Sequence, residues 1–322
     1  MEKFKKILKS FFLSEFMISI FGSKKLFKIL FNKKIVVFLF HEVSNNPSKF
    51  YSENNLNIKP DLFKKQIEFI MKNFKVIHPK ELYNNRSKTP TALITFDDGS
   101  IGIFKNAIRI LKDKNCPSIF FLNYAPFKKE IFWSGLVNFL CSKYDFFKKI
   151  VNPENNSFIK NKEFLYALPK HVEKFFETIN KKEVINAAKN YYGEFGTLND
   201  LKKISNSKLF CIGNHLYNHF NASLLNEIDL INNYNKNKMT FLNNYIDYFS
   251  YPYGQKDTCY NNKTNKILIK NGAKAIFTAN ALNFNNESLI FHRFSIDESF
   301  NSERILLAKL NYRRIRNFLS KN

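Results

Sequence analysis

The chain has 322 residues, of which 44% are apolar and 16% aromatic, and its formal net charge is +24 at pH 7. This length and apolar content allow a full hydrophobic core and exclude an intrinsically disordered protein. Lysines are spread through every segment, with no zinc-finger spacing and no RNA-binding aromatic motif, so the charge alone does not indicate a nucleic-acid partner. The four cysteines have no paired spacing, which favours buried thiols in a reducing compartment.

Residues 1–33 are both basic and apolar. The apolar run over 11–21 is interrupted by Glu15 and is too short to span a bilayer, and no small-residue cleavage site follows it. We therefore expect no secretory signal and a location in the cytoplasm or on the cytoplasmic face of the membrane. Two interpretations stay open: an amphipathic helix lying on that membrane face, or a helix packed on the protein's own surface.

After residue 33, apolar runs typical of buried strands alternate with amphipathic runs typical of helices. Strands are predicted over 35–40, 75–77, 91–96, 117–122, 209–213, 246–251, 274–278 and 291–296. Helices are predicted from residue 60, with Asp61 as the N-cap, and over 79–82, 102–114, 223–239, 260–271 and 302–319. This order predicts βα units and therefore a parallel sheet or barrel.

Residues 128–208 interrupt the alternation, because they are mostly helical in pattern and rich in Lys, Phe and Asn. We interpret them as an insertion in one βα loop, placed beside the functional site. They contain the one tryptophan of the chain, Trp133. Its ring could stack on a sugar, although a role in packing is the more frequent fate of a lone Trp.

The strand predicted over 91–96 ends in two adjacent carboxylates and a glycine, Asp97-Asp98-Gly99. Such a sequence is often an ordinary turn. At the C-terminal end of a parallel strand, however, it also stands where α/β proteins carry their chemistry. Consecutive strand residues point to opposite sides, so we expect one carboxylate to bind a metal and the other to act as a base. Gly99 allows the sharp turn that follows.

Two histidines, His215 and His219, follow another predicted strand. Their i, i+4 spacing would place both imidazoles on one face of a helical turn. Two histidines and one carboxylate form a common ligand set for a catalytic divalent ion. Such pairs also occur by chance, but this one follows a strand as Asp97 and Asp98 do, which would place all four side chains on the same rim of a barrel.

Three sequence motifs, in this order along the chain, resemble those of a known family. Thr95-Phe96-Asp97-Asp98-Gly99, His215-x-x-x-His219 and Tyr251-Pro252-Tyr253-Gly254 are similar to the first three motifs of the polysaccharide deacetylases, carbohydrate esterase family 4. The resemblance runs from about residue 35 to 297, interrupted by the insertion. Leu39-Phe40-His41 is similar to the Leu-x-His motif of the branch in which this motif lies on the N-terminal side, as in surface-polysaccharide and biofilm glycan deacetylases.

The resemblance implies a distorted (β/α) barrel of about seven parallel strands and metal-dependent hydrolysis of an N-acetyl group on a sugar. It implies a divalent metal, usually zinc, held by Asp98, His215 and His219. It further implies that Asp97 is the base that activates the attacking water. We expect a catalytic domain over 34–300 containing the insertion, preceded by the segment 1–33 and followed by a basic helical tail, 301–322.

Two further roles follow from the same resemblance. The backbone N–H of Tyr253 would help to stabilise the oxyanion, and His41 would protonate the leaving amine. His292 competes with His41 for the acid role, although His41 is preferred.

The chain departs from the family pattern at two positions, and the family's fourth motif cannot be placed in this sequence. Leu216 stands where a Ser or Thr usually follows the first histidine, so we expect a loop-bracing hydrogen bond to be lost. Ser250 stands where an Arg is frequent, and Arg293 is the predicted replacement as partner of Asp97.

The sequence therefore predicts a metal-dependent N-deacetylase that acts on an N-acetylated glycan or its lipid-linked sugar precursor in bacterial surface-polysaccharide assembly. Membrane contact through residues 1–33 stays open, and no nucleic-acid partner is expected. A first alternative is hydrolysis of another acyl or formyl amide on a lipid-linked sugar. A second is a catalytically retired barrel that binds glycan or membrane, against which the intact pairs Asp97-Asp98 and His215-His219 count.

Overall fold

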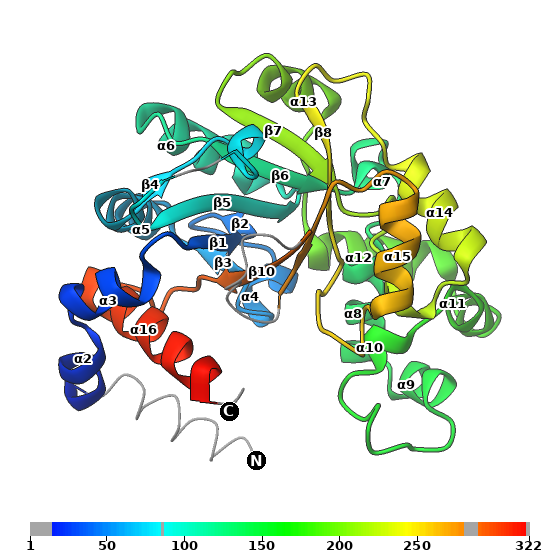
Figure 1. The fold of residues 1–322 in the computed structure, drawn as a ribbon. Helices are drawn as coiled ribbons and strands as arrows, with labels where there is room; N and C mark the ends of the chain where they lie inside the picture. Colours follow the sequence, from blue (N-terminus) through cyan, green and yellow to red (C-terminus); the bar gives the residue numbers. More distant parts are fainter. Residues whose placement is uncertain (1–14, 85–86, 280–288, 320–322) are drawn as a thin grey trace.

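A closed barrel of seven parallel strands forms the centre of the protein (Figure 1). The computed structural model describes residues 15–84, 87–279 and 289–319. Around the barrel the strand order is β1–β10–β9–β8–β7–β6–β5, and β5 pairs with β1 to close it. The strands are β1 (Ile35–Phe40), β5 (Thr91–Asp98), β6 (Ser118–Leu122), β7 (Phe210–Asn214), β8 (Tyr245–Ser250), β9 (Ala275–Thr278) and β10 (Ile290–Ser295). The predicted distorted (β/α) barrel is confirmed.

In the described part of the chain, three short strands lie outside this ring. Strand β4 (Lys75–Val76) pairs with the first residues of β5. Strands β2 (Glu42–Val43) and β3 (Asn57–Ile58) form a separate parallel pair after β1.

Helices cover the outside of the barrel between successive strands. They are α5 (Pro60–Asn73), α6 (Ile108–Asp113), α13 (Leu198–Ser205), α14 (Glu227–Lys236) and α15 (Asn262–Lys270). Helix α5 begins as predicted, but its N-cap is Lys59 and not Asp61. Pro60 occupies the first turn, where a missing N–H costs nothing, and Asp61 lies beside it, where a carboxylate favours the helix dipole.

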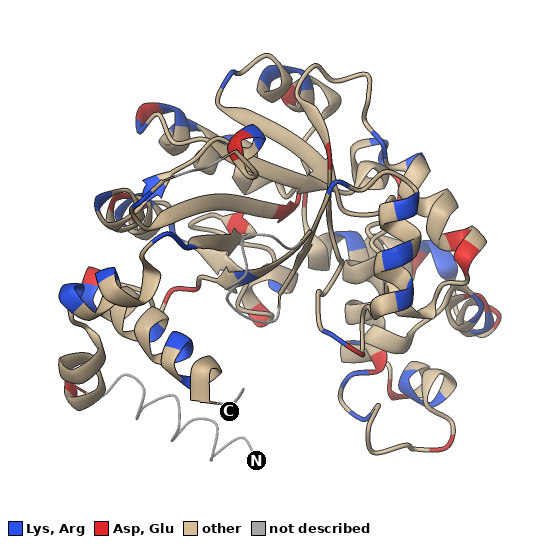
Figure 2. Ribbon diagram, viewed as in Figure 1, with Lys and Arg blue, Asp and Glu red and all other residues tan. Residues whose placement is uncertain are grey.

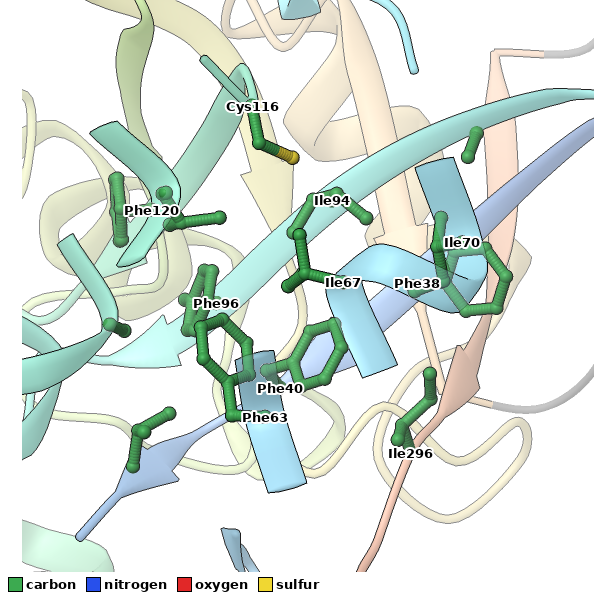
Figure 3. Packing of buried hydrophobic residues seen from close by; sticks show 14 of the residues in the cluster. Phe38, Phe40, Phe63, Ile67, Ile70, Ile94, Phe96, Cys116, Phe120 and Ile296 are labelled. Atoms are coloured by element: carbon green, nitrogen blue, oxygen red, sulfur yellow. The ribbon is translucent and has the colours of Figure 1, made fainter. Parts of the chain in front are cut away.

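The strands are apolar on both faces because both faces are covered. One face fills the barrel interior with side chains from all seven strands, among them Val37, Leu93 and Phe121. The other face packs under the helices: Phe38, Phe40 and Phe96 contact Phe63, Ile67 and Ile70 of α5 (Figure 3). This double burial explains why β1 is buried at all six positions and has no polar alternation.

A second group of helices stands between β6 and β7, within the predicted insertion over 128–208. They are α8 (Trp133–Lys143), α9 (Asp145–Val151), α10 (Glu163–Tyr166), α11 (Pro169–Phe176) and α12 (Lys181–Tyr192), and they follow the short α7 (Tyr124–Phe127). These helices share a hydrophobic cluster with α4 (Lys49–Glu53). Trp133 belongs to this cluster and lies edge-on to Phe220, with ring centroids 4.9 Å apart, so it is a packing residue. Helix α13 differs, because its Leu201 and Ile204 pack in the cluster around the barrel strands.

Both ends of the described chain meet in one helical group, formed by α2 (Glu15–Phe21), α3 (Lys24–Phe31) and α16 (Glu303–Leu319). The side-chain amide of Asn311 donates to the carbonyl of Phe21 at 2.7 Å, which ties α16 to the end of α2. Residues 1–14 of the predicted N-terminal segment lie outside the described residues. Within the described ranges, we find no helix with the length and apolar character needed to cross a bilayer.

Candidate metal centre and active site

The predicted site residues meet at the C-terminal ends of the barrel strands. A cavity of about 340 Å³ opens there. Its lining includes all seven predicted residues: His41, Asp97, Asp98, His215, His219, Tyr253 and Arg293. In Figure 2, basic residues are spread over outer helices such as α15 and α16, whereas the end of β5 is acidic.

Asp97 and Asp98 both reach this cavity, contrary to the expectation that they point to opposite sides. Asp98 has φ 70°, and Gly99 follows with φ 101°, so the extended alternation ends at Asp97. The Nε2 atom of His215 consequently lies 3.7 Å from Oδ2 of Asp97 and 3.6 Å from Oδ1 of Asp98. One imidazole faces both carboxylates.

His215 and His219 lie in the irregular loop after β7, so the predicted helical turn is wrong. Leu216 and His219 both have φ 58°, a left-handed conformation that is uncommon for residues other than glycine. These two positions curl the loop so that the imidazole centroids lie 4.9 Å apart. The i, i+4 spacing thus brings the rings together without helical geometry.

Buried asparagines brace this loop. The side-chain amide of Asn123 donates to the carbonyls of His215 and Leu216, at 2.5 and 2.8 Å. The side-chain carbonyl of Asn214 accepts from the backbone N–H of Leu216 at 3.0 Å. Asn237 in turn donates to Asn214 at 3.0 Å. These contacts replace the brace that Leu216 was expected to remove, and Leu216 itself is fully buried among apolar side chains.

The three predicted metal ligands form a compact buried group. Asp98, His215 and His219 each offer one ligand atom, and these atoms lie within 4.8 Å of one another. The Nδ1 atom of His215 lies 2.8 Å from the carbonyl of Ser250. Because a carbonyl can only accept, Nδ1 donates to it, and Nε2 is the ring nitrogen directed at the carboxylates.

The donor set fits a divalent ion. Oδ1 of Asp98 lies 3.2 Å from Nε2 of His219, yet within the described part of the chain no donor is oriented to satisfy this buried oxygen. An acceptor left unsatisfied inside a protein is costly unless a cation or a water completes it. Two imidazole nitrogens and one carboxylate match the ligands that zinc takes in catalytic sites.

The charge states of these groups suit the same interpretation. Burial raises the pKa of Asp98, but the imidazoles of His215 and His219 counteract it and hold that pKa well below its ordinary value. Burial lowers the pKa of His219 below its ordinary value, despite the nearby carboxylate of Asp98. At neutral pH we therefore expect an ionised Asp98 and a neutral His219, the forms that ligate metals.

Arg293 pairs with Asp97 as predicted. Its Nη1 and Nη2 atoms donate to Oδ1 and Oδ2 of Asp97 at 2.6 and 2.7 Å, a bidentate contact between two side chains that are almost fully buried. Burial raises the pKa of Asp97, and the guanidinium together with His215 lowers it below its ordinary value. Ser250 also approaches, with Oγ 3.5 Å from Oδ2 of Asp97.

The structure separates the two candidates for the general acid. His41 follows β1 and lines the cavity, whereas His292 does not. His292 lies on β10 between Phe291 and Arg293, both of which point into the barrel. Its own ring therefore faces outward, where Nδ1 lies 2.6 Å from Oγ1 of Thr278. Burial lowers the pKa of His41 below its ordinary value, although Asp98 and Asp97 partly offset the effect.

Tyr253 and an insertion residue enclose His219. The ring of Tyr253 lies edge-on to His219 at 4.9 Å, and Phe132, just before α8, lies edge-on at 5.3 Å. Ser134 and Asn138 of α8 also line the cavity. Sequence reasoning placed the insertion beside the site but did not identify these residues, because no motif marks them. One feature of the sequence could have located the bracing asparagines: Asn123 and Asn214 each come directly after the last residue of a predicted strand.

Comparison with solved structures gives the same fold. The chain superposes on IcaB from Ammonifex degensii (TM-score 0.57, 17% identity, 86% of this chain and 97% of that one). It also superposes on the Streptococcus pyogenes deacetylase PplD with a TM-score of 0.57 and 17% identity, over 87% of this chain and 99% of that one. A de-N-acetylase from Aggregatibacter actinomycetemcomitans superposes with a TM-score of 0.53 and 14% identity, over 85% of this chain and 99% of that one.

No protein-family profile matches the sequence, and no curated protein matches it in a sequence search. At these identities the likeness is one of fold. The structural neighbours of this chain are polysaccharide deacetylases, and it has their barrel.

Proposed function

We propose that this protein is a metal-dependent hydrolase that removes the N-acetyl group from an N-acetylated sugar. The observation that carries the proposal is the placement of Asp97 and Asp98 beside the same imidazole, His215, with only Asp98 completing a three-residue ligand group. This leaves Asp97, ionised and held by Arg293, as a carboxylate next to the ligands. A ligand set with an adjacent base is the arrangement that hydrolysis of an amide requires.

Bound by Asp98, His215 and His219, a divalent cation such as zinc would polarise the acetyl carbonyl and make a water acidic enough to attack it. Asp97 accepts a proton from the attacking water while the oxygen of that water bonds to the acetyl carbonyl carbon. The backbone N–H of Tyr253 donates to the oxyanion that develops. His41 gives a proton to the sugar nitrogen as the C–N bond breaks, which releases acetate and an amine.

We place the substrate among N-acetylated glycans or their lipid-linked precursors in bacterial surface-polysaccharide assembly, on the cytoplasmic side of the membrane. The cavity wall supports a sugar, since Asn54, Asn138 and Gln255 offer amide groups that can pair with hydroxyls beside apolar Phe50 and Phe164. Hydrolysis of another acyl or formyl amide would use the same residues. A retired barrel is disfavoured because the Arg293–Asp97 pair contributes no ligand and yet is retained with full bidentate geometry.

The test is to measure bound metal and acetate release on the same samples. Purified protein supplied with zinc should hold about one ion per chain and release acetate from N-acetylglucosamine oligomers. Asp97→Asn should keep the metal and lose acetate release, whereas Asp98→Ala should lose both. Wild-type protein that binds no zinc, or an Asp97→Asn variant with undiminished activity, would overturn the proposal.

We also propose contact with an anionic membrane through residues 1–33, extended to α16. Three exposed apolar side chains support it: Phe16 of α2, Ile29 of α3 and Phe318 of α16, at 65%, 68% and 69% exposure. Exposed cations such as Arg316 lie on the same helices. Phosphatidylglycerol vesicles should sediment the wild type, and replacing the three apolar residues by Ser should abolish this. The matched control is Ile228→Ser, 70% exposed on α14; equal loss there would overturn the proposal.

A further inference from the structure

The carboxylate of Asp98 has two oxygens with different surroundings. Oδ1 faces the two imidazoles. Oδ2 accepts a hydrogen bond from the hydroxyl of Tyr51 on α4, at 3.4 Å. Tyr51 is 1% exposed and Asp98 is 3% exposed, so the contact is buried. No motif in the sequence marks Tyr51, which stands 47 positions before its partner.

We propose that Tyr51 is a positioning residue for the metal site: its hydroxyl fixes the rotation of the Asp98 carboxylate so that Oδ1 faces the ion. This inference rests on the proposed function, because it takes Asp98, His215 and His219 as metal ligands. It adds a residue from outside the three motifs to the machinery of the site.

Asp98 needs such a contact for a geometric reason. The torsion that turns a carboxylate is broad and weakly restrained, so packing alone does not fix it. The backbone of Asp98 is in the left-handed region, at φ 70°, and strain of this kind persists only where the surroundings hold it. Carboxylates that ligate metals are themselves hydrogen-bonded, and losing the outer partner typically weakens metal affinity about 10- to 100-fold.

Tyr51 is itself held in place by its own helix and by the segment that follows it. Its ring lies edge-on to Phe50 at 5.0 Å, and its carbonyl accepts from the N–H of Leu56 at 2.8 Å. Helix α4 is tied to α12 of the insertion, because the hydroxyl of Tyr191 donates to Glu53 at 2.9 Å.

The experiment compares zinc binding in Tyr51→Phe and Tyr191→Phe. Both substitutions remove one hydroxyl that donates to a carboxylate, and both affect α4, but only Tyr51 touches Asp98. Zinc affinity is measured by competition with a chromogenic chelator, and cobalt is used as a spectroscopic probe of ligand geometry. Tyr51→Phe should bind zinc about 10- to 100-fold more weakly and show an altered cobalt spectrum, whereas Tyr191→Phe should match the wild type.

Thermal unfolding with and without zinc separates positioning from simple stabilisation. A merely structural role for Tyr51 would lower Tm equally in both conditions, whereas positioning predicts a smaller zinc-induced rise in Tm. Wild-type affinity and cobalt spectrum in Tyr51→Phe would overturn the inference while leaving the proposed function intact. Equal weakening in Tyr191→Phe would also overturn it. Failure of the wild type to bind zinc would overturn the proposed function, and the inference with it.

Discussion

The guanidinium of Arg293 donates two hydrogen bonds, of 2.6 and 2.7 Å, to the carboxylate of Asp97. The two residues come from β10 and β5, which are not neighbours, since β1 lies between them. The pair therefore bridges β10 and β5 past β1, and both side chains line the cavity. It fixes the orientation of Asp97 and keeps it ionised, and both properties are required of a base that must face a water.

Arg293→Lys should reduce kcat/KM by about 10²-fold, because an ammonium cannot reproduce the planar fork and small displacements of a base are costly. The pKa of Asp97 should rise as the paired charge recedes, so the acidic limb of the pH–rate profile should move to higher pH. Bound zinc should be unchanged, since Arg293 is not a ligand. A profile identical to that of the wild type would contradict this role.

The asparagine brace gives a second prediction. Asn123→Leu leaves the carbonyls of His215 and Leu216 buried without their donor, at a cost of about 1–3 kcal/mol for each group. We expect lower stability in chemical denaturation and also weaker zinc binding, because the loop that carries both imidazoles is released.

The chain offers a matched control for this brace. Asn244 also donates from its side chain to two buried carbonyls, those of Ile204 and Phe210, but away from the site. Asn244→Leu should lower stability by a similar amount and leave zinc affinity unchanged. Equal zinc affinity in the Asn123 and Asn244 variants would show that the brace has no effect on the metal site.

The barrel could be predicted from sequence because strands covered on both faces have continuous apolar runs, as over 35–40, and such runs need no tertiary information. The Asp-Asp and His-x-x-x-His pairs could be located for a related reason, since both follow strands. The conformation of the loop that carries His215 and His219 could not be predicted. Leu216 and His219 adopt a left-handed backbone that neither residue favours. The carbonyls of His215 and Leu216 are held by Asn123, more than ninety positions away. Tyr51 could not be predicted either, because it contacts Asp98 from 47 positions earlier in the chain.

The assignment of the general acid gives a third prediction. His41→Gln should lower kcat by about 10²- to 10⁴-fold with zinc retained, because proton donation to the leaving amine is lost. His292→Gln should keep activity near the wild-type value, since this ring faces outward beside Thr278. The reverse pattern, measured as acetate release at saturating substrate, would transfer the acid role to His292.

The last prediction concerns Glu303, which joins three helices. Its carboxylate pairs with Lys24 of α3 at 2.7 Å and with Lys72 of α5 at 2.8 Å, and it accepts from Asn73 at 2.9 Å. Partial burial raises the pKa of Glu303, but these donors outweigh it and lower that pKa to about 2. The folded state thus binds the proton less tightly than the unfolded chain, where the ordinary value of 4.5 holds.

The contribution of Glu303 is therefore fully present above pH 4.5 and is lost as the pH falls toward 2. Since both lysines are more than half exposed, we expect Glu303→Gln to lower the free energy of unfolding at pH 7 by only about 1 kcal/mol. The gap between wild type and variant should shrink steadily in urea titrations from pH 5 to pH 3, and also in 1 M salt at pH 7. A gap that is constant over this pH range would mean that Glu303 acts through packing and not through its charge.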